Sequence, residues 1–246
     1  MSAPIAGGAS AGRSSAGVAA LEFRNLVTAS ELAAMPPFEQ RIWGGESELV
    51  SVNMLVATIS EGGMAIGAFD DGALVGVVYG FATREPLVLH SHYLAVDPAY
   101  RRIGLGVELK QRQRTWCLSQ GITHMRWTYD PLQLGNAHLN LRVLGARGVS
   151  YHLDHYGSLG GINGSLPSDR VTVCWDLHAV AVPDAEAGSL AVDVPAVSAD
   201  EIAASAPAAH AARDYVREQM RDRIGNGWVL VDIDRDSRRY WLARTG

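Results

Sequence analysis

Apolar and polar positions alternate along the chain in a way that predicts short strands and amphipathic helices. The apolar run 21–27 predicts a strand, and a helix is expected over 30–43, starting at an N-capping Ser30. Pro36 and Pro37 predict that this helix is kinked or split. A second helix is expected over 52–60, ending at two glycines.

The middle of the chain reads as a hairpin, a long strand and a helix. Segments 64–69 and 73–81 are rich in β-forming residues and are joined by the turn sequence Asp-Asp-Gly at 70–72. A strand is expected over 87–96 and a helix over 107–119.

Further on, a strand is expected over 124–129 and a short helix over 136–144. Strands are expected over 149–156 and 170–177, separated by a loop, 157–169, that is rich in Gly and Ser. The element order β-α-α-β-β-β-α-β-α-β-β predicts a mixed α/β (α+β) layer structure.

Composition divides the chain into four parts. Residues 1–20, rich in Ala, Gly and Ser, are expected to be a flexible leader, and 21–178 the main domain. Residues 179–208 are expected to be a linker, and 209–246 a helix and β-hairpin that dock on the main domain or on a second subunit.

Charge and composition narrow the function classes. The 246 residues are 48% hydrophobic, carry a formal net charge of −5, and contain no apolar run long enough to span a membrane. The mild acidity argues against a nucleic-acid surface. The two cysteines, Cys117 and Cys174, argue against a disulfide scaffold or a structural zinc site, and we expect them to be packing residues. We therefore expect a cytoplasmic protein with no membrane, nucleic-acid or metal partner.

The segment that follows the strand 87–96 indicates ligand chemistry. After Asp97-Pro98 the chain carries Arg101, Gly104 and Gly106 and enters a helix at once. The first N–H groups of a helix have no internal partner and lie at the positive end of its dipole, and glycines let a phosphate approach them. The spacing is neither that of the nucleotide-binding P-loop nor that of the dinucleotide-binding loop.

This Arg-x-x-Gly-x-Gly loop, after a strand that ends in Ala-Val-Asp-Pro, resembles the acyl-CoA pyrophosphate loop of the GNAT superfamily of N-acyltransferases. The resemblance covers about 21–177. It implies a seven-stranded mixed sheet that splays between its fourth and fifth strands, with pantetheine in the gap. It also implies acyl-CoA, either acetyl-CoA or succinyl-CoA, as co-substrate, held by Leu94, Val96, Arg101, Arg102, Ile103, Gly104, Leu105, Gly106 and Asn136.

Longer runs resemble one GNAT subgroup. These are the segments 89–92, 127–133, 136–141 and 166–170, together with the helix-hairpin tail. Members of that subgroup are found with N-succinylamino acid racemases, and some transfer a succinyl group to D-amino acids.

The predicted fourth strand supplies the candidate base. His90, His92 and Leu94 are expected to share one face, because side chains alternate along a strand. His90 stands where several GNAT enzymes carry a catalytic glutamate, and an imidazole can accept an amine proton near neutral pH. The alternative is a pair of histidines that are hydrogen-bonded inside the sheet. A backbone N–H near Val96 is expected to polarise the thioester carbonyl.

The remaining candidates are less well defined. The tyrosine that protonates the thiolate in many GNAT enzymes is missing, because its position is Leu141; Tyr129, Tyr151 or a water could substitute. Asp130 could position the acceptor amine or assist proton removal, or could be a turn residue before proline.

Several charged or titratable side chains around the predicted pocket are further candidates for binding a ligand. Arg84 and Arg170 are candidates to bind an acceptor carboxylate. Lys110 is expected on a solvated helix face, although it could reach a phosphate of CoA. His152 and His155 are expected on opposite faces of a strand, which makes them a poor metal pair.

The sequence favours an N-acyltransferase acting on a small amine, with an amino acid as the favoured acceptor. Protein N-acetylation and a non-catalytic acyl-CoA-binding module are the alternatives. A homodimer through the tail or an edge strand stays open.

Overall fold

The computed structural model describes residues 17–44, 49–157, 159, 165–179 and 189–245. Most of the expected leader, part of the 157–169 loop and part of the expected linker lie outside these ranges. The elements are η1 (Val18–Ala20), β1 (Glu22–Asn25), α1 (Ala29–Leu32), α2 (Met35–Trp43), α3 (Val52–Ser60), β2 (Met64–Asp70), β3 (Ala73–Ala82), β4 (Val88–Val96), η2 (Pro98–Tyr100), α4 (Leu105–Ser119), β5 (His124–Tyr129), α5 (Leu134–Ala137), η3 (His138–Val143), β6 (Arg147–His152), β7 (Arg170–Asp176), β8 (Leu190–Asp193), α6 (Ala199–Ala203), α7 (Pro207–Met220), β9 (Trp228–Asp234) and β10 (Arg239–Arg244).

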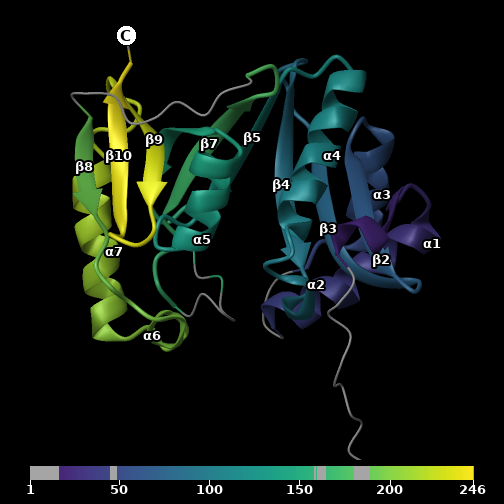
Figure 1. The fold of residues 1–246 in the computed structure, drawn as a ribbon, viewed down its shortest axis with the longest axis horizontal. Helices are drawn as coiled ribbons and strands as arrows, with labels where there is room; N and C mark the ends of the chain where they lie inside the picture. The colour runs from purple at the N-terminus through teal and green to yellow at the C-terminus, as the bar shows by residue number, and fades with distance from the viewer. Residues whose placement is uncertain (1–16, 45–48, 158, 160–164, 180–188, 246) are drawn as a thin grey trace, which may run out of the picture.

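One mixed sheet runs through the molecule. In the described residues it has ten strands in the order β1-β2-β3-β4-β5-β7-β6-β9-β10-β8. Only β4 and β5 pair in parallel; the other recorded strand pairs are antiparallel. Figure 1 shows the two halves diverging between β4 and β5. The mixed α/β class and the split after the fourth strand are as the sequence predicted.

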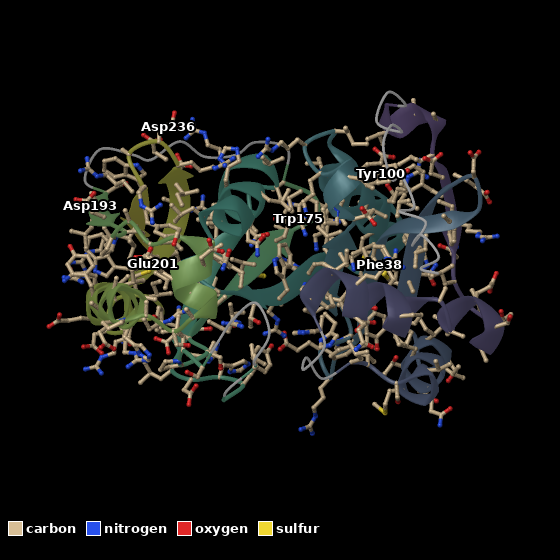
Figure 2. All side chains as sticks on the ribbon, turned by 90° about the horizontal axis from the view of Figure 1, so that it is seen from below. Phe38, Tyr100, Trp175, Asp193, Glu201 and Asp236 are labelled. Atoms are coloured by element: carbon tan, nitrogen blue, oxygen red, sulfur yellow. The ribbon has the colours of Figure 1, made fainter. Side chains whose placement is uncertain are left out.

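Two apolar layers cover β2, β3 and β4. Leu105 and Leu109 of α4 pack on one face, in a core that continues under α5. Leu32, Phe38 and Leu55, from α1, α2 and α3, pack on the other face. Figure 2 shows α4 and α5 along one side of the sheet and α2, with Phe38, along the other.

The expected helix over 30–43 is split, as its prolines predicted. Its first part, α1, is capped by Thr28 and not by the expected Ser30, because Thr28 and Glu31 form a reciprocal capping box. Its second part, α2, has proline in its first turn, where the missing N–H has no intrahelical partner to lose.

The segment after β7 differs most from the expectation. The predicted linker contains β8 and α6, and α6 begins at a capping box of Ser198 and Glu201. The tail does not stand apart from the sheet. Leu230 of β9 pairs with Gly148 of β6, so β9, β10 and β8 extend the same sheet beyond the seven strands expected.

Among the described helices, none has both the length and the apolar character needed to cross a bilayer.

Candidate active site

The strands β4 and β5 separate after a short paired stretch. Their pairing covers Val88, Leu89 and His90 on β4, and it ends with His90 opposite Arg126. Beyond this pair β4 keeps its ladder to β3 up to Val96. The edge of β4 that faces β5 is therefore free of strand partners over its second half, as far as the described residues show.

A β-bulge interrupts β4 at the point of separation. Gly80 and Tyr79 of β3 pair with Ser91 and Tyr93, so His92 is the extra residue. A side chain at Gly80 would place its Cβ 2.8 Å from the His90 carbonyl oxygen, so glycine permits this close approach.

The bulge corrects one prediction about side-chain faces. The His90 and His92 rings lie on one face, with centroids 6.0 Å apart. Leu94, however, packs with Val96 against the α4 side of the sheet. The expectation that Leu94 shares the histidine face was wrong, because one extra residue reverses the alternation.

Backbone groups of β4 point into the split. The Asp97 N–H donates to the Val75 carbonyl of β3 at 2.9 Å. Since successive residues of a paired strand direct their backbone groups to opposite edges, Ala95 also faces β3, while Leu94 and Val96 face β5. These are the two residues expected to pair with a pantetheine arm.

The chain then turns into α4 through the residues predicted to hold the pyrophosphate. Arg102 and Gly104 adopt positive φ angles of 72° and 90°. Gly104 is the N-cap of α4 and no side chain among the described residues caps the helix. The Nε of Arg101 donates to the Val96 carbonyl at 3.4 Å. The result is an open helix N-terminus flanked by two exposed arginines, which suits a diphosphate.

His90 lies between aromatic and cationic neighbours. Its ring is stacked on Phe81, with centroids 4.8 Å apart. Burial lowers its pKa to about 4, with further lowering by His92, Arg126 and other nearby basic groups. Burial also lowers the pKa of the His92 imidazole. Both rings are therefore neutral near pH 7 and able to accept a proton.

Asp130 has the turn role that the sequence suggested as the alternative, and its carboxylate also pairs with an arginine of the tail. Its two carboxylate oxygens accept from Nη1 and Nη2 of Arg213, in α7, at 2.7 and 2.6 Å, and Oδ1 also accepts from the Leu132 N–H. Both charged residues are buried. The ion pair of Asp130 with Arg213 thus joins the tail to the end of β5, so we do not propose Asp130 as a base.

The other predicted contacts are spread around the split. Arg84 is exposed in the turn between β3 and β4, and Asn136 is exposed on α5. Arg170 is buried beside Asp130 at 3.9 Å and lies over the Tyr156 ring.

Of the two tyrosines that could substitute for the missing one, Tyr151 is hydrogen-bonded to a carboxylate and Tyr129 is buried. Leu141, at the expected tyrosine position, is fully buried in the π-helical segment η3. The Tyr151 hydroxyl donates to Asp169 at 2.8 Å, and burial raises its pKa. Tyr129 is buried in the core, where its pKa is raised as well.

Lys110 is the site residue that the sequence placed wrongly. It is not solvated: it is buried under the split, in contact with β4 and β5. One signal was available, because Lys110, Gln113 and Cys117 follow the i, i+3, i+7 spacing of a single helical face, and all three are buried.

The prediction for the second histidine pair was also wrong. The rings of His152 and His155 lie 4.7 Å apart, since His155 follows the end of β6 and is not held to its alternation. Among the described residues no group of three or more His, Cys, Asp or Glu side chains could hold a metal ion.

Comparison with known proteins identifies the fold. Residues 32–145 match the acetyltransferase (GNAT) family, and no curated protein matches the chain. The ribosomal-protein-S18-alanine N-acetyltransferase of Escherichia coli is 17% identical, with a TM-score of 0.53 over 65% of this chain and 96% of that one. A phosphinothricin acetyltransferase of Sinorhizobium meliloti, in complex with acetyl-CoA, is 16% identical, with a TM-score of 0.52 over 64% and 88%. An N-acetyltransferase of Staphylococcus aureus is 13% identical, with a TM-score of 0.52 over 64% and 98%.

At these identities the structural likeness establishes the fold, and the family match adds the segment from α1 to η3, with its loop and split strands. The chain therefore carries a GNAT acetyltransferase domain over residues 32–145.

Proposed function

We propose that the protein transfers an acetyl or succinyl group from acyl-CoA to the amino group of a small acceptor, an amino acid, by direct attack of the amine on the thioester. The observation that carries this proposal is the continuous path from the open helix N-terminus at Gly104, along the free edge of β4, to His90.

The donor half of the site would hold acyl-CoA through main-chain groups. The N–H groups from Arg101 to Gly106 would bind the diphosphate, and Leu94 and Val96 would pair with the pantetheine arm. A backbone N–H aimed into the split could also stabilise negative charge on the thioester carbonyl. These contacts need no particular side chain, which agrees with the apolar character of Leu94 and Val96.

The acceptor half would use the face that carries His90. Arg126 is the register partner of His90, so both side chains project to the same side of the sheet. Arg126 pairs with Glu85, whose side chain is 62% exposed, and such exposed pairs hold together weakly. A carboxylate on the acceptor could therefore replace Glu85 and form a bidentate pair with the guanidinium. This supports an amino acid as acceptor, as does the resemblance of several sequence runs to the racemase-associated subgroup.

His90 would take the proton that the amine loses on attack. Its neutral imidazole is a proton acceptor, and its half-buried place beside the split keeps it close to the point where β4 and β5 diverge.

Calorimetry with CoA, followed by an assay of thiol release, tests the proposal. We expect micromolar or tighter binding of CoA, and CoA release with acetyl-CoA or succinyl-CoA across a panel of D- and L-amino acids. Tight binding without turnover on any amine would instead indicate a non-catalytic module. Turnover only on peptides would indicate protein acetylation.

A comparison of variants at two glycines with similar positive φ angles distinguishes an effect on CoA binding from an effect on stability. Gly104 and Gly72 have φ angles of 90° and 80°, and open space surrounds both Cβ positions. Gly104→Ala and Gly72→Ala should each cost about 1–2 kcal/mol of stability, because alanine is strained at positive φ. Only Gly104→Ala should also weaken CoA binding, by about tenfold or about 1.4 kcal/mol. Equal CoA affinity in the two variants would exclude the loop as the binding site.

The acid-base behaviour of His90 gives a second check. In the free protein its ring should titrate with a pKa of about 4, since burial and nearby cations disfavour the protonated form. A bound amino acid would change the charges and the water beside His90, and it would therefore shift the pKa of this ring. NMR titration of the histidine ring, assigned with His90→Ala, measures both values. An unchanged pKa on adding a substrate amino acid would contradict the assigned acceptor position.

A further inference from the structure

Lys110 lies where the two halves of the sheet begin to separate. Its Nζ donates to Ser91 Oγ at 2.9 Å and to Gln113 Oε1 at 2.9 Å, and it lies 3.8 Å from the centre of the Trp127 ring. Ser91 and Trp127 are the residues immediately after the last β4–β5 pair, His90 with Arg126. The ammonium group therefore bridges β4 and β5 at the vertex of the split, on the face opposite His90.

This cation is buried without a counter-charge. The residue is 3% exposed, and within the described ranges no carboxylate lies at ion-pair distance from it. Burying an ammonium group without an anion costs free energy, even when it is hydrogen-bonded. Perturbed charges of this kind are typical of functional sites. Lys110 is also the only lysine in the chain.

The proposed reaction supplies an anion at that position. A pantetheine arm that starts at the loop and follows Val96 and Leu94 would reach the level of Ser91 after five strand residues, about 17 Å. The thioester is at that end of the arm, so the N–H near Val96, which the sequence suggested for the thioester carbonyl, would pair with the arm instead. We propose that Lys110 protonates the departing CoA thiolate, an inference that rests on the proposed function.

The step balances in atoms and electrons. The acceptor nitrogen bonds to the thioester carbonyl carbon, the carbon–sulfur bond breaks, and its electron pair stays on sulfur. A proton moves from Nζ to the sulfur, which leaves free CoA thiol and a neutral lysine. The proton lost by the amine goes to His90, and exchange with solvent restores both groups.

The surroundings of Lys110 favour such a donor. Burial lowers its pKa to about 7, and Cys117, seven residues further along the same face of α4, raises it by a smaller amount. His90 is the titratable group on β4 that senses its charge. Trp127 on β5 and Met64 on β2, which Gln113 contacts, are uncharged. The role also accounts for Leu141 at the usual tyrosine position, since the proton would come from α4.

Lys110→Met tests the assignment. It should lower turnover with acyl-CoA by about a hundredfold, the usual scale for a lost general acid, and leave CoA affinity unchanged. Arg112→Met is the matched control, because Arg112 lies on the exposed face of the same helix and pairs with Glu108; it should keep full turnover. Thermal unfolding confirms that each variant is folded.

A second measurement does not depend on activity. The ultraviolet absorbance of the thiolate reports the pKa of the thiol of bound CoA. We expect that pKa to be lower in the wild-type protein than in Lys110→Met. If the methionine variant does not fold, Lys110→Arg serves, because arginine keeps the charge but does not release a proton near neutral pH. The arginine variant should keep the lowered thiol pKa and lose turnover.

The outcomes separate the two proposals. If Lys110→Met turns over as fast as the wild type, the role of Lys110 is overturned and the proposed function stays intact. The same holds for Lys110→Arg if only that variant folds. If the wild type binds CoA but acylates no amine, the proposed function fails, and the thiol titration still decides whether Lys110 contacts the sulfur. That contact is excluded if the thiol of bound CoA has the same pKa in the wild type and in Lys110→Met. If only Lys110→Arg folds, a thiol pKa in that variant equal to the pKa of free CoA excludes the contact.

Discussion

Replacing His90 with alanine should lower kcat by about a thousandfold, in the middle of the range for a lost general base. The affinity for CoA should not change, because the loop at the start of α4 and the free edge of β4 stay intact. Stopped assays of CoA release give kcat, and calorimetry gives the affinity. Added imidazole should restore part of the activity of His90→Ala, since it can occupy the space beside Phe81 and accept the proton.

His178→Ala is the control for this variant. His178 is exposed just after β7, so its loss should leave kcat at the wild-type value. If His92→Ala loses activity while His90→Ala keeps it, the base is His92 of the bulge. Loss of CoA affinity in His90→Ala would indicate a structural role for the stacked ring.

The sequence predicted the loop because its structure is local. A strand, two arginines, two glycines and a helix start lie within about a dozen residues, so the anion site forms without help from distant parts of the chain. The positive φ of Gly104 is a property of the glycine itself and of the turn that it opens. The split between β4 and β5 was predicted through family resemblance and not through the pattern of apolar residues.

The interior of the site was harder to predict. The bulge at His92 depends on Gly80 of β3, so the face of Leu94 is set by a partner strand and not by the alternation within β4. The predicted exposure of Lys110 was wrong for a related reason. A charged residue on a helix is most often solvated, and the chain alone does not show that Lys110 is buried. Its burial depends on Ser91, Gln113 and Trp127, which come together only in the folded sheet.

The position of the tail could not be predicted either, because it depends on contacts between residues far apart in the sequence. Pairing of β9 with β6 joins residues far apart in sequence, and no local signal fixes which strand the tail will extend. Asp130 was expected either at the acceptor or in a turn, and it does accept from the Leu132 N–H in the turn, but Arg213 of α7 also pairs with both of its oxygens. The position of Asp130 at the end of β5 was predicted correctly, but its pairing with Arg213 could not be predicted from the sequence.

Arg213→Met should therefore destabilise the protein by about 3–5 kcal/mol, since the buried Asp130 carboxylate loses its bidentate partner and keeps only the longer, 3.9 Å contact to Arg170. Urea unfolding measures the loss. The exposed pair of Arg221 and Asp222 is the control, and Arg221→Met should cost less than about 1 kcal/mol. Adding Asp130→Asn to Arg213→Met should recover much of the loss, because the carboxylate that has lost its bidentate partner is removed; a double-mutant cycle would show this as coupling. Additive effects of the two substitutions would mean that the tail is held by its apolar core and by β9, and that the buried ion pair contributes little.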